Sequence, residues 1–130
     1  MPISDEHRSY IFDLLEDWAA MDSKELETEA SKENIDILFD LSKELSADHM
    51  ERENMTSQEF CELVEELREA KRFWSRQLGD VIIKASDLAK VAGKEPALSL
   101  LREFKTKCSS RFYREVADNQ MASITRKYTQ

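Results

Sequence analysis

The 130-residue sequence contains only two glycines, two prolines, two cysteines and two histidines, and each scarcity excludes a class of structure or site. So few turn-forming residues do not suit a β-sandwich, while 41% hydrophobic residues are too many for a disordered chain. No apolar run approaches the roughly 20 residues that span a bilayer. The amino terminus also lacks the basic patch and apolar stretch of a secretory signal, so we expect a cytoplasmic protein.

Patterns that support catalysis or metal binding are missing as well. The histidines at 7 and 49 do not form an HxxxH motif, and neither Cys61 nor Cys108 stands at metal-ligand spacing. Two glycines are too few for a phosphate-binding loop, a dinucleotide-binding fingerprint or a nucleophile elbow. Cys108 falls in an apolar stripe, where an inert buried thiol is the common case. We therefore expect no enzyme, no cofactor and no metal ion.

What the sequence does contain is helical periodicity with recognisable capping residues. Ser4, Asp22 and Thr56 are suitable N-caps for three helices, and Ser31 is a fourth candidate if the second segment is divided. Gly79 and Gly93 suit helix ends, and Pro96 suits a first turn. The pattern predicts five helical segments, at about residues 5–21, 23–45, 57–78, 80–92 and 96–124.

These segments predict an all-α protein, in which residues 1–130 form a single-domain antiparallel bundle of four to five helices. Apolar residues at helical spacing mark the side of each segment that faces the interior. The predicted core is formed by Leu14, Trp18, Leu38, Leu41, Leu45, Leu63, Leu67, Phe73, Leu88, Leu101, Phe104 and Phe112.

Charge is divided sharply along the chain. Residues 1–66 contain 20 acidic and 5 basic residues, whereas residues 67–130 contain 7 acidic and 14 basic residues. The simplest physical reason is pairing between the two halves inside the bundle. The net charge of −8 leaves an acidic surplus that must face outward, and it opposes non-specific binding to nucleic acid or anionic lipid.

The acidic residues of the second segment form a regular pattern. If residues 23–46 form one helix, six carboxylates from Glu25 to Glu44 fall within an arc of about 100°, along a ridge about 29 Å long. Such a ridge resembles a phosphate backbone electrostatically, although a solvated face is the simpler interpretation. The partner-binding residues that we predict on this ridge and on the first segment are Glu29, Glu33, Asp36, Asp40, Glu44, Asp13, Glu16 and Asp17.

Basic residues could instead bind nucleic acid. Arg68, Arg72 and Arg76 form a stripe beside Phe73 and Trp74, a combination that suits phosphate contacts and base stacking. Glutamates at 65 and 69 can pair with these arginines, however, so this interpretation is less favoured. A second basic group in the last segment consists of Lys107, Arg111 and Arg114.

The sequence therefore favours a non-enzymatic protein-binding module. Its composition is similar to that of small acidic immunity proteins and antitoxins, and we expect a basic protein partner such as a toxin or nuclease domain. Two alternatives are a helical adaptor or regulator that acts by dimerisation or apolar-face contacts, and a nucleic-acid-binding regulator that uses the basic carboxy-terminal half.

Overall fold

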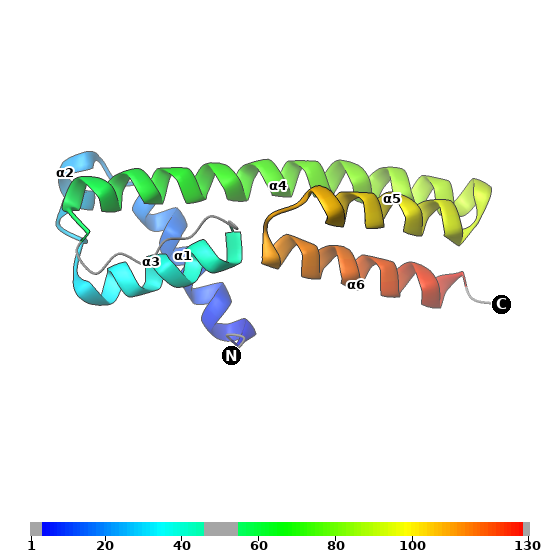
Figure 1. Ribbon diagram of the computed structural model, residues 1–130, viewed down its shortest axis with the longest axis horizontal. Coiled ribbons are helices and arrows are strands. Elements are labelled where there is room, and N and C mark those ends of the chain that lie inside the picture. Colours follow the sequence, from blue (N-terminus) through cyan, green and yellow to red (C-terminus); the bar gives the residue numbers. More distant parts are fainter. Residues whose placement is uncertain (1–3, 46–54, 129–130) are drawn as a thin grey trace. The chain divides into compact units, whose positions relative to one another are not determined.

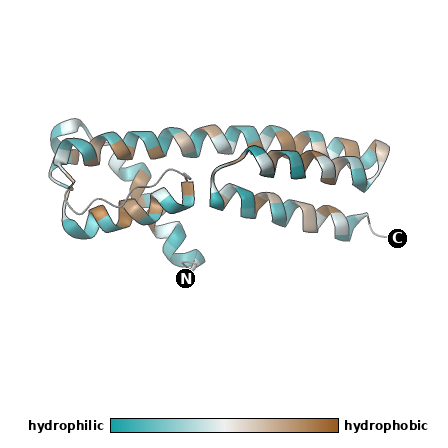
Figure 2. Cartoon of the chain, in the orientation of Figure 1, coloured by the Kyte–Doolittle hydropathy of each residue, from teal (hydrophilic) through white to brown (hydrophobic). Residues whose placement is uncertain are grey.

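A computed structural model describes residues 4–45 and 55–128, and in these ranges all regular secondary structure is helical (Figure 1). The helices in the described ranges are α1 (Asp5–Ala19), α2 (Ser23–Glu27), α3 (Lys32–Leu45), α4 (Ser57–Ala92), α5 (Lys94–Lys107) and α6 (Arg111–Lys127). The predicted all-α fold is confirmed, and the described part of the chain contains six helices where four to five were expected. Hydrophilic and hydrophobic residues alternate along these helices, as amphipathic helices require (Figure 2).

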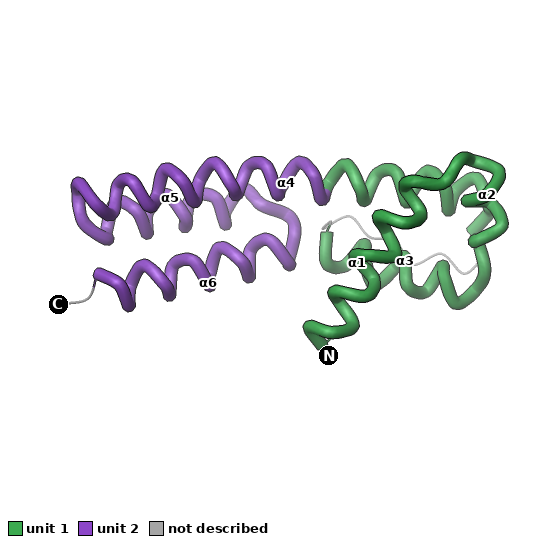
Figure 3. The backbone as a smooth tube through the Cα atoms, turned by 180° about the vertical axis from the view of Figure 1, so that it is seen from behind, with its two compact units in different colours: residues 1–70 green, residues 71–130 purple. Residues whose placement is uncertain are grey.

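The chain forms two compact units, residues 1–70 and 71–130 (Figure 3). Helix α4 contributes residues 57–70 to the first unit and residues 71–92 to the second. The prediction of a single domain for residues 1–130 stays a prediction. So does the interpretation that the acidic and basic halves pair with each other.

The first unit has a core built from α1, α2, α3 and the beginning of α4. Trp18 of α1 lies edge-on against Phe60 of α4, with ring centroids 5.2 Å apart. Ser4 caps α1 by accepting a hydrogen bond from the His7 amide (3.1 Å). The buried apolar side chains of this unit are Ile11, Leu15, Trp18, Leu26, Leu38, Leu41, Leu45, Phe60, Val64 and Leu67.

The second unit has a core built from α5, α6 and the later part of α4. Trp74 of α4 and Phe104 of α5 meet edge-on, with centroids 5.9 Å apart. Small alanine side chains line the buried side of α4, and α5 packs against α6. The buried apolar side chains here are Leu78, Ala85, Ala89, Ala97, Leu98, Leu101, Phe104, Cys108, Tyr113, Ala117 and Ile124.

Most of the residues predicted to form the core are buried in the structure, but some are not. The side chains confirmed as buried are Trp18, Leu38, Leu41, Leu45, Leu67, Leu101 and Phe104. Those that are only partly buried are Leu14, Leu63, Leu88 and Phe112. The prediction for Phe73 is wrong, because its side chain is 51% exposed and the neighbouring Trp74 makes the contact with α5 instead.

Three helix boundaries differ from the prediction. Ser31 caps α3 by accepting from the Asn34 amide (3.2 Å), so residues 23–45 form two helices. Gly79 does not end a helix, because the amphipathic pattern continues through it and α4 runs to Ala92. The last segment is divided where Ser110 caps α6 by accepting from the Tyr113 amide (3.2 Å).

Gly79 and Gly93 have different backbone conformations, and substitution with alanine tests this difference. Gly79 is helical, and a Cβ atom added there meets nothing within 4 Å. Gly93, which separates α4 from α5, has a φ of 89° that L-residues rarely adopt. We expect Gly79→Ala to raise the free energy of unfolding by about 0.4–1 kcal/mol. Gly93→Ala should lower it by a larger amount, since the native φ strains alanine.

Urea denaturation followed by circular dichroism measures both glycine variants against the native sequence. A lower free energy of unfolding for Gly79→Ala would contradict the helical conformation at residue 79. An unchanged free energy of unfolding for Gly93→Ala would contradict the positive φ at residue 93.

No helix within residues 4–45 and 55–128 combines the length and the apolar character needed to cross a lipid bilayer.

Candidate functional site

The eight carboxylates predicted to bind a partner lie on two helices and on the turn before one of them. Asp13, Glu16 and Asp17 belong to α1, and Glu33 to Glu44 belong to α3. Glu29 lies in the turn between α2 and α3, where its carbonyl oxygen accepts a hydrogen bond from Asn34 Nδ2 (2.7 Å). The premise of one continuous helix through residues 23–46 is therefore wrong, and the six-carboxylate ridge does not form as a single helical stripe.

The exposure of these carboxylates separates them into groups. Asp13, Asp17, Glu33 and Asp36 are exposed, and Glu44 is buried. Glu16, Glu29 and Asp40 are partly exposed. The groups that a partner can reach directly are thus the outer residues of α1 and the first turns of α3.

Glu44 is part of the interior of the first unit. Its side chain is 3% exposed and forms an ion pair with Arg8 of α1, whose Nη2 lies 3.4 Å from Glu44 Oε2. Arg8 is itself only 11% exposed. Sequence reasoning overlooked Arg8, although it precedes Ile11 and Leu15 by three and seven positions and so lies on the buried side of α1.

Two further contacts involve carboxylates at the inner margin of the surface. His7 Nε2 of α1 lies 3.7 Å from Asp40 Oδ2 of α3. Arg68 Nε of α4 lies 3.8 Å from Glu16 Oε2 of α1. These contacts tie α1 to its neighbours, so its outward face is held by both α3 and α4.

The outward face of α1 carries three exposed carboxylates and an exposed aromatic ring. Glu6, Tyr10, Asp13 and Asp17 follow the spacing i, i+4, i+7, i+11, which places them on one side of a helix. The Tyr10 side chain is 57% exposed. Because tyrosine is enriched among residues that dominate binding energy, Tyr10 is a candidate anchor, although the sequence pattern did not indicate it. We call these four residues the α1 surface.

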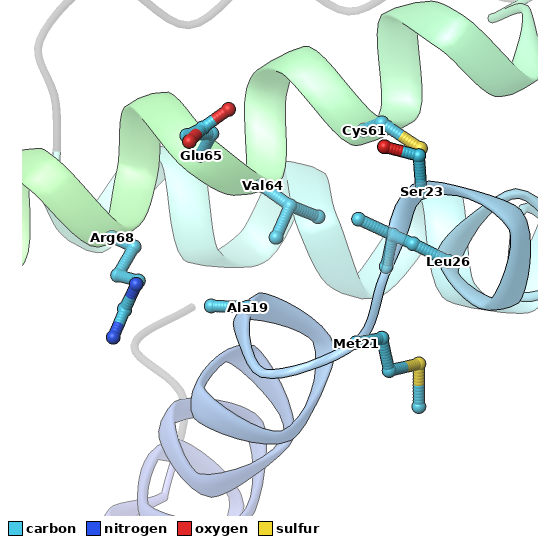
Figure 4. Close-up of a pocket in the computed structure, with 8 residues that line it drawn as sticks. All are labelled: Ala19, Met21, Ser23, Leu26, Cys61, Val64, Glu65 and Arg68. Atoms are coloured by element: carbon cyan, nitrogen blue, oxygen red, sulfur yellow. The ribbon is translucent and has the colours of Figure 1, made fainter.

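A pocket of about 150 Å³ opens between the end of α1, α2 and α4 in the first unit. Figure 4 shows Arg68 at one end of this pocket and Cys61 beside Ser23 at the other. Burial raises the pKa of the Cys61 thiol above its ordinary value, and the negative charge of the nearby Glu27 carboxylate raises it further. A raised pKa keeps the thiol protonated near neutral pH, so the pocket does not present an activated nucleophile.

The second cysteine is also unsuited to nucleophilic chemistry. Cys108 is buried in the second unit, and burial raises the pKa of its thiol. Its Sγ donates a weak hydrogen bond to the Ser110 carbonyl oxygen (3.6 Å), in the turn between α5 and α6. In the part of the chain that the structure describes, no three side chains of His, Cys, Asp or Glu are grouped so that they could hold a metal ion.

The basic residues considered for nucleic acid binding are interspersed with carboxylates. Lys107 Nζ lies 3.0 Å from Glu103 Oε1, and Lys105 forms an ion pair with Asp118. A shallow hollow on α5 and α6 contains Arg111 and Arg114, together with Lys105, Glu115 and Asp118. Its mixed charge does not form a continuous basic track for a phosphate backbone.

Comparison of the chain with models of protein families, with curated proteins and with solved structures finds no match. Indications of a function therefore come from the surface chemistry of the two units. The most distinctive feature of that chemistry is the concentration of acidic side chains in the first unit.

Proposed function

We propose that this chain is a non-enzymatic protein-binding module whose acidic first unit binds a basic protein. The form of this function that we favour is an immunity protein or inhibitor that sequesters a cationic toxin, such as a nuclease. A cytoplasmic location suits the two free cysteines and is part of the proposal.

The observation that supports the proposal best is the coincidence of the charge boundary with the boundary between the units. Residues 1–70 contain 21 acidic and 6 basic residues, a net charge of −15. Residues 71–130 contain 6 acidic and 13 basic residues, a net charge of +7. A compact unit with so large an excess of one sign generates a strong local field, which accelerates encounters with a partner of opposite charge.

Within the first unit, the α1 surface is the best candidate for the contact itself. Its carboxylates provide attraction at a distance, and Tyr10 supplies an apolar body with a hydroxyl group that can be buried at the centre. Glu33 and Asp36 of α3 provide a second exposed acidic group. Binding of a cationic protein would relieve the mutual repulsion of these carboxylates.

The proposal is tested with charge-reversed variants of each helix. The partner is captured from a lysate of the native host, identified by mass spectrometry, purified and titrated at two salt concentrations. Asp13→Lys/Asp17→Lys should raise the Kd about tenfold or more and flatten its salt dependence. Glu33→Lys/Asp36→Lys measures the contribution of α3 in the same way.

The matched control is Glu95→Lys/Glu103→Lys, which changes the net charge equally but places the new lysines in the second unit. Its affinity should stay within about threefold of the native value. If the control weakens binding as much as the α1 variant does, total charge rather than the α1 surface controls the affinity. If the α1 and α3 variants both bind like the native protein, or the captured partner is acidic, the proposal fails.

A further inference from the structure

The later part of α4 exposes large apolar side chains on its outer side. In the second unit, Phe73 is 51% exposed, Ile83 is 64% exposed and Val91 is 83% exposed. Single exposed apolar residues are common on protein surfaces, so their arrangement decides whether they have a role.

These three residues lie on one face of the helix. On a projection of about 100° per residue, they fall with Arg76, Asp80 and Asp87 within an arc of about 80°. The buried residues Leu78, Ala85 and Ala89 lie on the opposite side of the helix. All six residues of this outer face are exposed, and we call them the α4 face.

The order of residues along the α4 face is nearly symmetrical about residue 82. Phe73 and Val91 stand nine positions before and nine positions after that point. Arg76 precedes it by six positions, and Asp87 follows it by five. Asp80 precedes it by two, and the exposed Lys84, at the edge of the face, follows it by two. Among Arg76, Asp80, Lys84 and Asp87, each charge on one side of the centre therefore has a charge of opposite sign at a similar distance on the other side.

We propose that the α4 face binds the α4 face of a second copy of this chain, with the two helices antiparallel. A two-fold axis near residue 82 places Phe73 against Val91, Arg76 against Asp87, and Asp80 against Lys84 of the other copy. Ile83 lies next to the axis and therefore packs against its own counterpart. The three contacts between different residues each occur twice, because the interface of a two-fold dimer uses the same surface on both copies, whereas the contact between the two Ile83 side chains occurs once.

A parallel arrangement is disfavoured by the same charges. In a parallel pair each residue faces its own copy, so Arg76, Asp80 and Asp87 would each meet a like charge. In the antiparallel pair only Arg72 and Lys90 bring like charges together. Both are exposed and lie about 20° outside the arc, at the edge opposite Lys84, where water and salt screen their repulsion.

The length of the face indicates a weak dimer. From Phe73 to Val91 the helix extends about 27 Å, at a rise of about 1.5 Å per residue. A contact between two single helices of this length is at the small end of specific interfaces, below about 1,200 Å² in total. We expect dissociation constants in the micromolar range. This inference uses the second unit and stands independently of the proposed function of the first.

The experiment is sedimentation velocity on the full chain, at loading concentrations from about 10 μM to about 1 mM. The native chain should shift from monomer to dimer across this range. Ile83→Asp should raise the dissociation constant more than tenfold, because it places two carboxylates beside the axis. Arg76→Glu should raise it about tenfold by opposing Asp87 of the other copy. Arg76→Glu/Asp87→Arg restores both pairs with reversed sign and should return the dissociation constant to within about threefold of the native value.

The matched control is Arg102→Glu, which makes the same charge change at an exposed position of α5. It should dimerise like the native chain, and circular dichroism checks that every variant keeps its helical content. A native chain that stays monomeric at about 1 mM would overturn the proposal. It would also be overturned if the reversed pair dimerised no better than Arg76→Glu, or if Arg102→Glu weakened the dimer equally.

Discussion

Replacing Trp18 with alanine is expected to lower the free energy of unfolding of the first unit by about 3–5 kcal/mol. The Trp18 side chain is fully buried and packs edge-on against Phe60, so it joins α1 to the first turns of α4. Its removal loses the transfer free energy of a large apolar group and leaves a cavity that its neighbours fill only in part. Small domains commonly have a total stability of 5–15 kcal/mol, so this loss would be severe.

Urea denaturation, monitored by circular dichroism, measures the effect of Trp18→Ala on the free energy of unfolding. The chain contains one other tryptophan, Trp74, which belongs to the second unit and reports there by fluorescence after Trp18 is removed. Tyr10→Ala is the control, because Tyr10 is exposed on the same helix and its loss should change stability by less than about 0.5 kcal/mol. A loss below about 1 kcal/mol for Trp18→Ala would show that the α1–α4 contact is not a major part of the core.

The second large effect is expected at the ion pair between α1 and α3. Arg8→Met removes the guanidinium group that lies 3.4 Å from the Glu44 carboxylate, while that carboxylate stays in the interior. Taking one partner from a buried ion pair typically costs about 3–5 kcal/mol, because the remaining charge has lost both water and its partner. The double variant Arg8→Met/Glu44→Leu replaces both groups with apolar ones and should recover most of this loss.

A double-mutant cycle compares the free energies of unfolding of the native chain, the two single variants and the double variant. A coupling energy above about 2 kcal/mol is the expected result, since each single variant breaks the same contact between two largely buried charges. A coupling energy near zero would mean that Arg8 and Glu44 do not depend on each other. The exposed pair Lys107–Glu103, in which both side chains are more than half exposed, is the comparison, with a coupling of about 0.3–0.5 kcal/mol.

Local capping signals predicted helix starts well. Ser4 and Asp22 both accept hydrogen bonds from amides three residues later, as their sequence context indicated. Thr56 and Glu59 form a reciprocal capping box, in which each side chain accepts from the other residue's amide (3.1 and 3.0 Å). These interactions depend only on residues within one turn, which is why sequence alone reveals them.

Helix ends and interruptions were harder to predict. Glycine permits a left-handed backbone but does not impose it, so Gly93 ends α4 and Gly79 does not. The break at Ser110 was hidden because apolar residues at helical spacing continue across it, from Phe104 through Cys108 to Phe112. The spacing of apolar residues indicates which side chains face a core. It does not reveal a turn that leaves this spacing unchanged.

The candidate surface was predictable only in part. The acidic excess and the identities of Asp13, Asp17, Glu33 and Asp36 follow from the sequence, and these four side chains are exposed. The burial of Glu44 could not be foreseen, because its partner Arg8 lies 36 positions away along the chain. Which helix meets which is decided by tertiary packing, and helical periodicity carries no information about that choice.

The coincidence of the charge and unit boundaries also affects how copies of the chain interact with one another in dilute buffer. One unit carries a net charge of −15 and the other a net charge of +7, so the acidic unit of one molecule attracts the basic unit of the next. At an ionic strength of about 0.1–0.15 M, salt largely screens this attraction at distances beyond a Debye length of about 8–10 Å. The chain should therefore behave as a polyampholyte whose acidic and basic charges are separated along the sequence. Its solubility should rise with ionic strength.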